Sequence, residues 1–241
     1  MKKILVIGAT GQIGSALMTK LRKEYGNDNV VAGYIEGVPL SDELKNGGPL
    51  EIADVTNAQQ IAAIIDKYKI DSIYNLAAIL SAQAEKRPLL AWNIQIGGVL
   101  NLLEISREKG CSLFTPSSIG AFGDSSPKMK TPQETIQRPR TIYGVSKVSC
   151  ELLSDYYFYR YGVDTRSVRF PGLISYETLP GGGTTDYAVE IYYEAIRSGR
   201  YTCAVPHDVY MDMIYMPDVL RACVELGKTV GEALKKKCRG E

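Results

Sequence analysis

The feature that most constrains the fold stands near the N-terminus, where a short apolar run leads directly into a glycine-rich turn. Residues 3–7 form a mostly apolar run rich in β-branched residues, which predicts a buried strand. Gly8, Gly11 and Gly14 follow with the spacing GxxGxxG, and residues 12–25 then show helical periodicity. Glycines in such a turn let backbone approach a pyrophosphate, and the helix N-terminus favours its negative charge. The N-terminus therefore predicts a dinucleotide site, with a purely structural turn as the alternative.

Strands and helices alternate through the first 170 residues. The expected strands are residues 3–7, 30–34, 51–54, 72–75, 112–116 and 164–170. The expected helices are residues 12–25, 57–68, 89–109 and 143–161, the second capped by Thr56 or Asn57 and the last two ended by Gly110 and Gly162. This order predicts an α/β protein with a Rossmann-type, doubly wound parallel sheet and helices on both faces. Residues 36–50, rich in Gly, Pro and Asn, are expected to form a loop.

The pattern changes after Pro171. We expect a helix over about 185–197, a strand at 201–205, an apolar stretch at 211–215 and a helix over 217–226. The chain is accordingly divided into a dinucleotide-binding Rossmann domain, residues 1–170, and a small C-terminal lobe, residues 171–241.

Composition and charge exclude several classes of function. A formal net charge of +1 gives no reason to expect nucleic acid or an anionic membrane as a partner. We find no apolar run of the roughly 18 residues that a membrane span requires, and the first apolar run is too short for a signal peptide, so we expect a cytoplasmic protein. The five cysteines form no CxxC pair, which indicates reduced thiols. With His207 as the one histidine, neither a metal site nor a Ser-His-Asp hydrolase is expected.

Tyr143 and Lys147 carry the clearest indication of chemistry. Four residues apart on a helix, they share one face. A free tyrosine has a pKa of about 10, too high for a base near neutral pH, and a neighbouring ammonium favours the phenolate. Together with the dinucleotide loop, the pair predicts hydride transfer on an alcohol or ketone.

The residues after the second and third strands indicate which dinucleotide binds. An acidic residue for the adenosine ribose is expected about 20 residues beyond the glycine loop, and Glu36 can reach the ribose from just past the end of the strand. No arginine stands there for the 2′-phosphate of NADP, so we expect NAD. Asp54 and Val55 are the next candidate contacts, to the adenine, with a turn aspartate as the alternative for Asp54.

Four motifs in order resemble the extended short-chain dehydrogenase/reductase family, which contains the sugar-nucleotide epimerases. They are residues 8–14 (GATGQIG), 75–78 (NLAA), 116–118 (PSS) and 143–147 (YGVSK). The resemblance implies that Ser118 joins Tyr143 and Lys147 as catalytic residues, with the tyrosine as general acid–base. It implies cofactor contacts from Gly8, Gly11, Gln12, Ile13, Gly14, Glu36, Asp54, Val55, Leu76, Ala77, Ala78, Tyr143, Lys147 and Pro171.

A narrower resemblance is to the short-chain type of L-threonine 3-dehydrogenases. It rests on residues 131–135 (TPQET), 169–175 (RFPGLIS), 180–188 (PGGGTTDYA) and 211–218 (MDMIYMPD). It implies oxidation of L-threonine at Cβ to 2-amino-3-oxobutanoate, with NAD as hydride acceptor and Ser81 as a substrate contact unless it caps a helix.

The residues themselves suit this substrate. Thr184 and Thr185, at a helix start, can offer N–H groups and hydroxyls to the carboxylate. Asp186 can meet the ammonium, or can be a helix cap. Ser118 and Tyr143 would hydrogen-bond the substrate hydroxyl.

Two other functions remain open: another enzyme of the extended family, such as a nucleotide-sugar epimerase, and an NAD-binding protein without turnover. The possibility of a protein without turnover arises from Tyr34 and Gln95, because relatives carry an aspartate at the position of Tyr34 and an asparagine at that of Gln95. Relatives also extend well past residue 241, which implies an incomplete substrate lobe here. They pair through the helices that carry Gln95 and Tyr143, so we expect a homodimer, with ordinary packing as the alternative for the tyrosines of the second helix.

Overall fold

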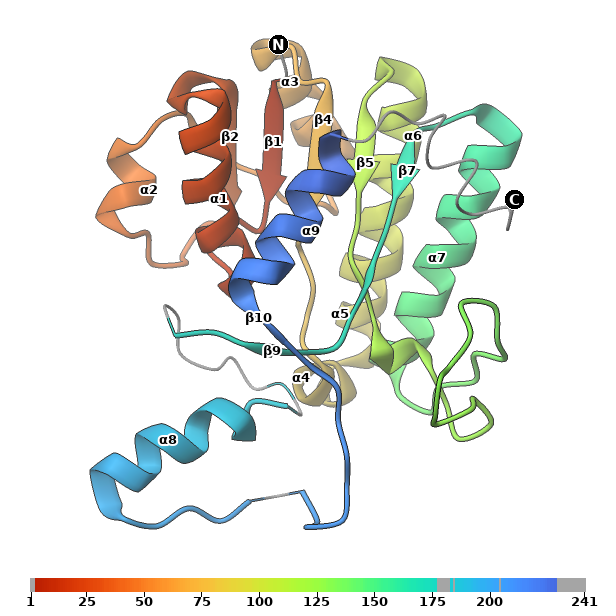
Figure 1. Cartoon of the computed structure of the whole chain (residues 1–241). Helices are drawn as coiled ribbons and strands as arrows, with labels where there is room; N and C mark the ends of the chain where they lie inside the picture. The colour runs from red at the N-terminus through yellow and green to blue at the C-terminus, as the bar shows by residue number, and fades with distance from the viewer. Residues whose placement is uncertain (1–2, 177–182, 184, 204, 229–241) are drawn as a thin grey trace.

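A six-stranded parallel sheet forms the centre of the computed structural model, which describes residues 3–176, 183, 185–203 and 205–228. The strand order is β3-β2-β1-β4-β5-β7 (Figure 1). The strands are β1 (Ile4–Ile7), β2 (Val30–Tyr34), β3 (Leu50–Ile52), β4 (Ser72–Asn75), β5 (Ser112–Phe114) and β7 (Thr165–Arg166). From β1 the chain adds β2 and then β3 toward one edge of the sheet. It then crosses back to β4 and adds β5 and β7 toward the other edge. The predicted α/β, doubly wound fold is confirmed.

Strand β1 shows why the sheet needs cover on both faces. All four of its side chains are at most 1% exposed. Successive side chains of a strand point to opposite faces, so Leu5 and Ile7 enter one core cluster while Ile4 and Val6 enter the other. An uninterrupted apolar run is therefore the pattern that a doubly covered parallel strand requires.

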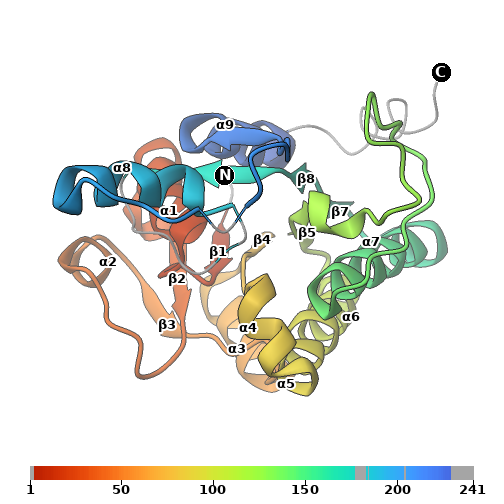
Figure 2. The same ribbon diagram turned by 90° about the horizontal axis from the view of Figure 1, so that it is seen from below.

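Helices cover the two faces as the alternation predicts. On one face lie α3 (Ala58–Tyr68), α6 (Gly98–Lys109) and α7 (Ile142–Tyr161), and on the other α1 (Gln12–Tyr25) and α9 (Met216–Lys228) (Figure 2). Helix α3 buries Ile61, Ile64 and Ile65, the spacing of one helical face.

Local signals set the helix ends where the sequence predicts them. Asn57 caps α3 by accepting the N–H of Gln60 at 3.1 Å, as one of the two predicted caps. Helices α6 and α7 end at Gly110 and Gly162, both left-handed. Thr141 accepts the N–H of Gly144 at 3.0 Å and so sets the start of α7, the helix that carries Tyr143.

The predicted helix over 89–109 is not one regular α-helix. It consists of α5 (Pro88–Trp92), a π-helical turn η2 (Asn93–Gly97) and α6. By length and composition alone, Pro88–Lys109 is long and apolar enough to cross a membrane. Half of its apolar window is buried inside the protein, as in a core helix, so it is weak evidence for a span.

Other differences arise from contacts that the sequence pattern does not show. The expected loop 36–50 contains a short helix, α2 (Asp42–Asn46), which buries Leu44 and is capped by Ser41. A second short helix, α4 (Ser81–Lys86), follows β4, and single 3-10 turns lie at η1 (Asn27–Asn29) and η3 (Ile119–Ala121). The described residues within 201–205 form no strand, which corrects that prediction.

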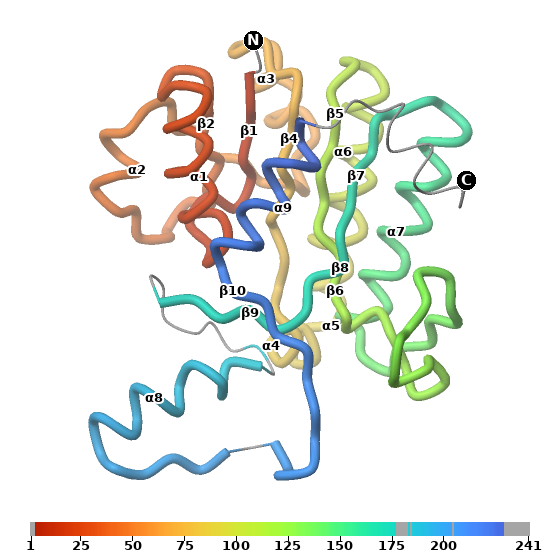
Figure 3. The backbone as a smooth tube through the Cα atoms, viewed as in Figure 1, coloured from red at the N-terminus to blue at the C-terminus, as the bar shows by residue number. Residues whose placement is uncertain are grey.

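The predicted strand 164–170 divides into β7 and β8 (Arg169–Phe170). Strand β8 leaves the main sheet and pairs with β6 (Ser117–Ser118), and β9 (Gly172–Ile174) pairs with β10 (Met213–Tyr215). Helix α8 (Tyr187–Ser198) stands beyond these pairs, away from the main sheet, while α9 returns to it (Figure 3). The division of the chain at residue 170 stays a prediction.

Candidate active site

The glycine turn lies at the carboxyl end of β1, beside the loop that follows β4. These neighbouring strands lead to opposite edges of the sheet, and ligands bind in the crevice that such a reversal creates. Gly8 has φ +82°, and a Cβ added there would lie 3.0 Å from the carbonyl carbon of Leu76 and 3.1 Å from the nitrogen of Ala77. The two loops are thus in backbone contact, which brings the predicted cofactor residues 76–78 to the glycine turn.

Gly14 sets how closely α1 approaches this turn. A Cβ at Gly14 would lie 2.1 Å from the carbonyl oxygen of Gly8, so only glycine fits. Among the described residues, no side chain caps α1 at Gly11 and its first turn carries no acidic residue. The N–H groups of Gln12 and Ile13 begin this helix, and first-turn N–H groups lack intrahelical acceptors. The turn therefore fits a pyrophosphate, because side chains would fill the cradle and an anion suits the helix end.

The three residues predicted to contact adenosine differ in exposure and in their partners. Glu36 is exposed in the turn after β2. Asp54 follows β3, and its Oδ1 accepts both the N–H of Thr56 at 2.9 Å and its hydroxyl at 2.8 Å, the geometry of a turn aspartate. Val55 is buried against Gly98 of α6. Contacts from Glu36, Asp54 and Val55 to adenosine stay predictions.

Helix α7 presents Tyr143 and Lys147 at this end of the sheet. The Lys147 ammonium lies 5.4 Å from the centre of the Tyr143 ring and donates to the carbonyl of Pro116 at 2.8 Å. Lys147 is only 8% exposed. Its charge is thus held between the tyrosine and the end of β5.

Ser118 lies against the same tyrosine. A Cβ added at Gly120 would be 3.2 Å from Cε1 of Tyr143 and 3.5 Å from Oγ of Ser118, so both side chains flank this glycine. The Ser118 hydroxyl also accepts the N–H of Gly120 at 3.1 Å. The structure therefore brings together the serine, tyrosine and lysine that the sequence predicts as catalytic residues.

Gln95 connects the cofactor loop to α7. Its Oε1 accepts the N–H of Ile79 at 3.2 Å, and its Nε2 donates to the hydroxyl of Ser146. Ser146 in turn donates to the carbonyl of Tyr143 at 2.7 Å. The π-helical turn carries this 4% exposed amide, and π-turns are frequent at functional sites.

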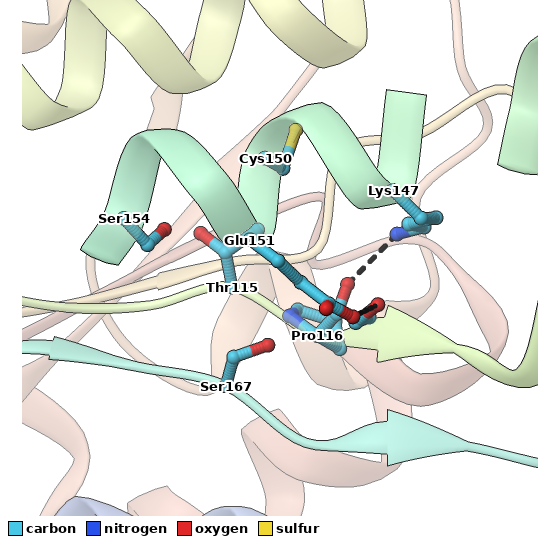
Figure 4. A pocket seen from close by; sticks show the side chains of 8 residues that line it. Thr115, Pro116, Lys147, Cys150, Glu151, Ser154 and Ser167 are labelled. Carbon is cyan, nitrogen blue, oxygen red and sulfur yellow. Dashed lines mark hydrogen bonds between the residues drawn. The ribbon is translucent and has the colours of Figure 1, made fainter. Parts of the chain in front are cut away.

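One part of the site lay outside the sequence predictions. Glu151 of α7 lies near Lys147 and faces Pro116 (Figure 4), and its carboxylate accepts the hydroxyl of Ser117. Glu151 pairs with Arg169 of β8 at 2.8 Å. Burial opposes ionisation of Glu151, but hydrogen bonds from Arg169, Ser117 and Gln137 hold its pKa below the ordinary value. Its spacing of four residues from Lys147 is the signal that could have identified it.

Ser81, a predicted substrate contact, and Pro171, a predicted cofactor contact, lie in segments next to the predicted catalytic residues. Ser81 is the first residue of α4, and Glu85 of that helix accepts the N–H of Ile142, next to Tyr143, at 2.7 Å. Pro171 follows Phe170, the partner of Ser118 across the β6–β8 pair. The position of Ser81 within α4, after the N-cap Leu80, differs from the predicted capping alternative.

The glycine-rich segment is partly described. Thr185 packs on β9, where a Cβ at Gly172 would meet the Thr185 Cβ at 2.7 Å. Asp186 occupies the N-cap position of α8 without a side-chain cap hydrogen bond, and its carboxylate accepts the N–H of Gly183 at 2.7 Å. Thr184 lies outside the described residues. Substrate contacts from these three residues stay predictions.

Comparisons with known proteins agree with this geometry. The model of the NAD dependent epimerase/dehydratase family matches residues 4–236. An uncharacterized epimerase/dehydratase of Staphylococcus haemolyticus is 57% identical over 226 residues, which cover 94% of this chain and 71% of the relative.

Solved structures of high similarity include L-threonine dehydrogenases. The enzyme from Clostridium difficile is 55% identical with a TM-score of 0.89, covering 95% of this chain and 72% of that chain. The holo form of a GalE-like L-threonine dehydrogenase from Cupriavidus necator is 43% identical with a TM-score of 0.90, covering 95% and 74%. The fold, the glycine cradle and these matches lead to one conclusion: the chain belongs to the NAD dependent epimerase/dehydratase family, the extended short-chain dehydrogenases/reductases.

Proposed function

We propose that this protein oxidises L-threonine at Cβ to 2-amino-3-oxobutanoate with NAD as the hydride acceptor. The observation that carries the proposal is the meeting of Ser118, Tyr143 and Lys147 beside a glycine cradle that fits a pyrophosphate. The 55% identity to an L-threonine dehydrogenase supports the choice of substrate within the family.

In the proposed reaction, Tyr143 is the general base. Ser118 and Tyr143 hydrogen-bond the Cβ hydroxyl, and the tyrosine takes the hydroxyl proton as the C–H bond breaks. NAD, when bound, accepts the hydride that leaves Cβ, so the alcohol becomes a ketone. Lys147, held by Pro116, stabilises negative charge on the phenolic oxygen and can also bind the nicotinamide ribose.

The cofactor assignment rests on the cradle and on the end of β2. Gly8, Gly11, Gln12, Ile13 and Gly14 would bind the pyrophosphate through backbone. Contacts from the loops after the other strands would come from Glu36, Asp54, Val55, Leu76, Ala77, Ala78 and Pro171. The carboxylate of Glu36 favours the 2′-hydroxyl of NAD over the 2′-phosphate of NADP.

The substrate's charged groups would be held by the segment before α8 and by α4. We assign the carboxylate to Thr184, Thr185 and Ser81, and the ammonium to Asp186. The Asp186 carboxylate can accept from an ammonium as well as from Gly183, since each oxygen has two lone pairs.

We further propose a cytoplasmic homodimer. Helix α7 exposes Leu152, Tyr156 and Tyr159, and the adjacent α5 exposes Leu89 and Trp92. Two-fold pairing would bury this apolar surface, as expected for a symmetric dimer. Sedimentation equilibrium tests the pairing, and a monomer at micromolar concentration would contradict it.

NADH formation from L-threonine tests the function directly. Purified protein should produce NADH with NAD and L-threonine, and far less with NADP, L-serine or L-allo-threonine. Thr185→Ala should raise the KM for threonine while the Kd for NAD stays unchanged. NAD binding without turnover of threonine would contradict the proposal and favour a non-catalytic protein.

A second candidate is a nucleotide-sugar epimerase, favoured by the names of the family and of the curated relative. An epimerase uses the same tyrosine and cofactor but holds a nucleotide beyond the sugar. Binding of UDP-glucose with a lower Kd than threonine, or conversion of it to another sugar nucleotide, would support this candidate.

A further inference from the structure

A half-buried carboxylate lies one turn beyond Lys147 on α7 and collects hydrogen bonds from three separate segments. Glu151 accepts from Nε and Nη2 of Arg169 at 2.9 and 2.8 Å. It also accepts from Nε2 of Gln137 at 3.0 Å and from the hydroxyl of Ser117. Both carboxylate oxygens are therefore engaged, and the bidentate arginine fixes the plane of the group.

These bonds join α7 to the strand that ends in Ser118. Lys147 holds the carbonyl of Pro116, and Glu151, one turn later, holds the side chain of the next residue, Ser117. Figure 4 shows Lys147 and Glu151 extending from the same helix toward this strand. The residue that follows, Ser118, is thus positioned relative to Tyr143 by two adjacent attachments to the helix that carries Tyr143.

Arg169 connects Glu151 to β8 and to the segment that contains Gln133. It lies in β8, whose next residue pairs with Ser118, and its Nη1 donates to the carbonyl of Gln133 at 2.9 Å. Its guanidinium also stacks on Phe122, 5.2 Å from the ring centre. One ion pair therefore connects α7, β6, β8 and the segment that includes Gln133 and Gln137.

We propose that Glu151 and Arg169 are positioning residues that set the separation of the Ser118 hydroxyl from the Tyr143 phenol. The proposal rests on the proposed function for its kinetic consequences, because both groups must reach one substrate hydroxyl. A misplacement of about 1 Å can lower a rate by about 100-fold. An ion pair that served stability alone could be replaced by apolar side chains of similar volume without loss.

That difference provides the test. In the double variant Glu151→Leu with Arg169→Met, the volume is retained but Ser117 loses its acceptor. We expect a urea midpoint close to that of the wild type, a kcat for threonine at least tenfold lower, and a Kd for NAD within twofold. Ser117→Ala, a single near-isosteric change, should lower kcat several-fold with little effect on stability.

A matched control breaks a comparable ion pair away from the site. Asp164 pairs with the buried Arg166 at 2.6 Å in the segment of β7. Asp164→Asn should lower the urea midpoint and leave kcat unchanged. If the double variant instead keeps the wild-type kcat, or if only its stability and not its kcat falls, the positioning role is wrong.

Hydrogen exchange measures positioning without substrate. The amides of Thr115 and of residues 117–120 should exchange faster in the double variant and in Ser117→Ala than in the wild type, while exchange in β1 stays unchanged. If the wild type forms no NADH from threonine, the proposed function fails, but this comparison still decides the positioning role. Equal exchange at Thr115 and residues 117–120 in all three proteins would overturn it, and should the double variant not fold, Ser117→Ala decides alone.

Discussion

Gly14 offers a quantitative test of the dinucleotide cradle. A Cβ at this position would lie 2.1 Å from the carbonyl oxygen of Gly8, 2.9 Å from its carbonyl carbon and 3.0 Å from Cα of Ala9. All three atoms are backbone, so no side chain can turn aside to relieve the contact. Since ordinary contact begins near 3.4 Å, the helix and the turn must separate by about 1 Å in Gly14→Ala.

The substitution should weaken cofactor binding as well as lower stability. Overpacking of this kind costs about 1–3 kcal/mol of stability. The separation would move first-turn N–H groups away from a bound pyrophosphate, and one hydrogen bond to a charged group is worth about 1.5–3 kcal/mol. The Kd for NAD should therefore rise by about 10- to 150-fold.

The assay combines a calorimetric titration of the protein with NAD and urea unfolding. Gly97→Ala is the matched control, because Gly97 has helical φ −60° and a Cβ there meets nothing within 4 Å. The control should keep the wild-type Kd and gain up to about 1 kcal/mol of stability. A Gly14→Ala protein with a Kd within threefold of the wild type would refute the reasoning.

Three further predictions concern the chemistry and the titrating groups. Tyr143→Phe should lower kcat by at least about 100-fold and leave the Kd for NAD within threefold, measured by NADH formation and calorimetry. Folding holds the pKa of Glu151 below its ordinary value of 4.5. The ionised carboxylate therefore contributes its full stabilisation above about pH 4.5, and this contribution is lost as the pH falls through the lower pKa of the folded state. The urea midpoint of Glu151→Gln should therefore fall less than that of the wild type on acidification from pH 5 to 3.5, and parallel curves would contradict this. A thiol reagent at pH 8 should modify the exposed Cys203 faster than the buried Cys111, Cys150 and Cys223, as measured by peptide mass mapping. Burial raises the pKa of these three thiols to about 11, 11 and 12, respectively.

The sequence alone determined the features that depend on neighbours within about one helical turn or one strand. The apolar run of β1, the glycine turn and the periodicity of α1 predicted the dinucleotide unit with the helix bounds of the structure. Asn57 and Gly162 marked helix ends because a cap is a contact between residues a few positions apart. Tyr143 and Lys147 were predictable as a pair for the same reason, since four residues place them on one helical face.

Only the tertiary structure decided the features that need partners far along the chain. The π-helical turn at Gln95, the departure of β8 from the main sheet and the ion pair of Glu151 with Arg169 each join segments at least 18 residues apart. Side-chain pattern does not encode such pairings, because a buried amide or carboxylate can be satisfied by whichever donors the packed fold brings to it. The sequence thus named the candidate reacting groups, and the packing of α7 against β6 and β8 decided how they are held together.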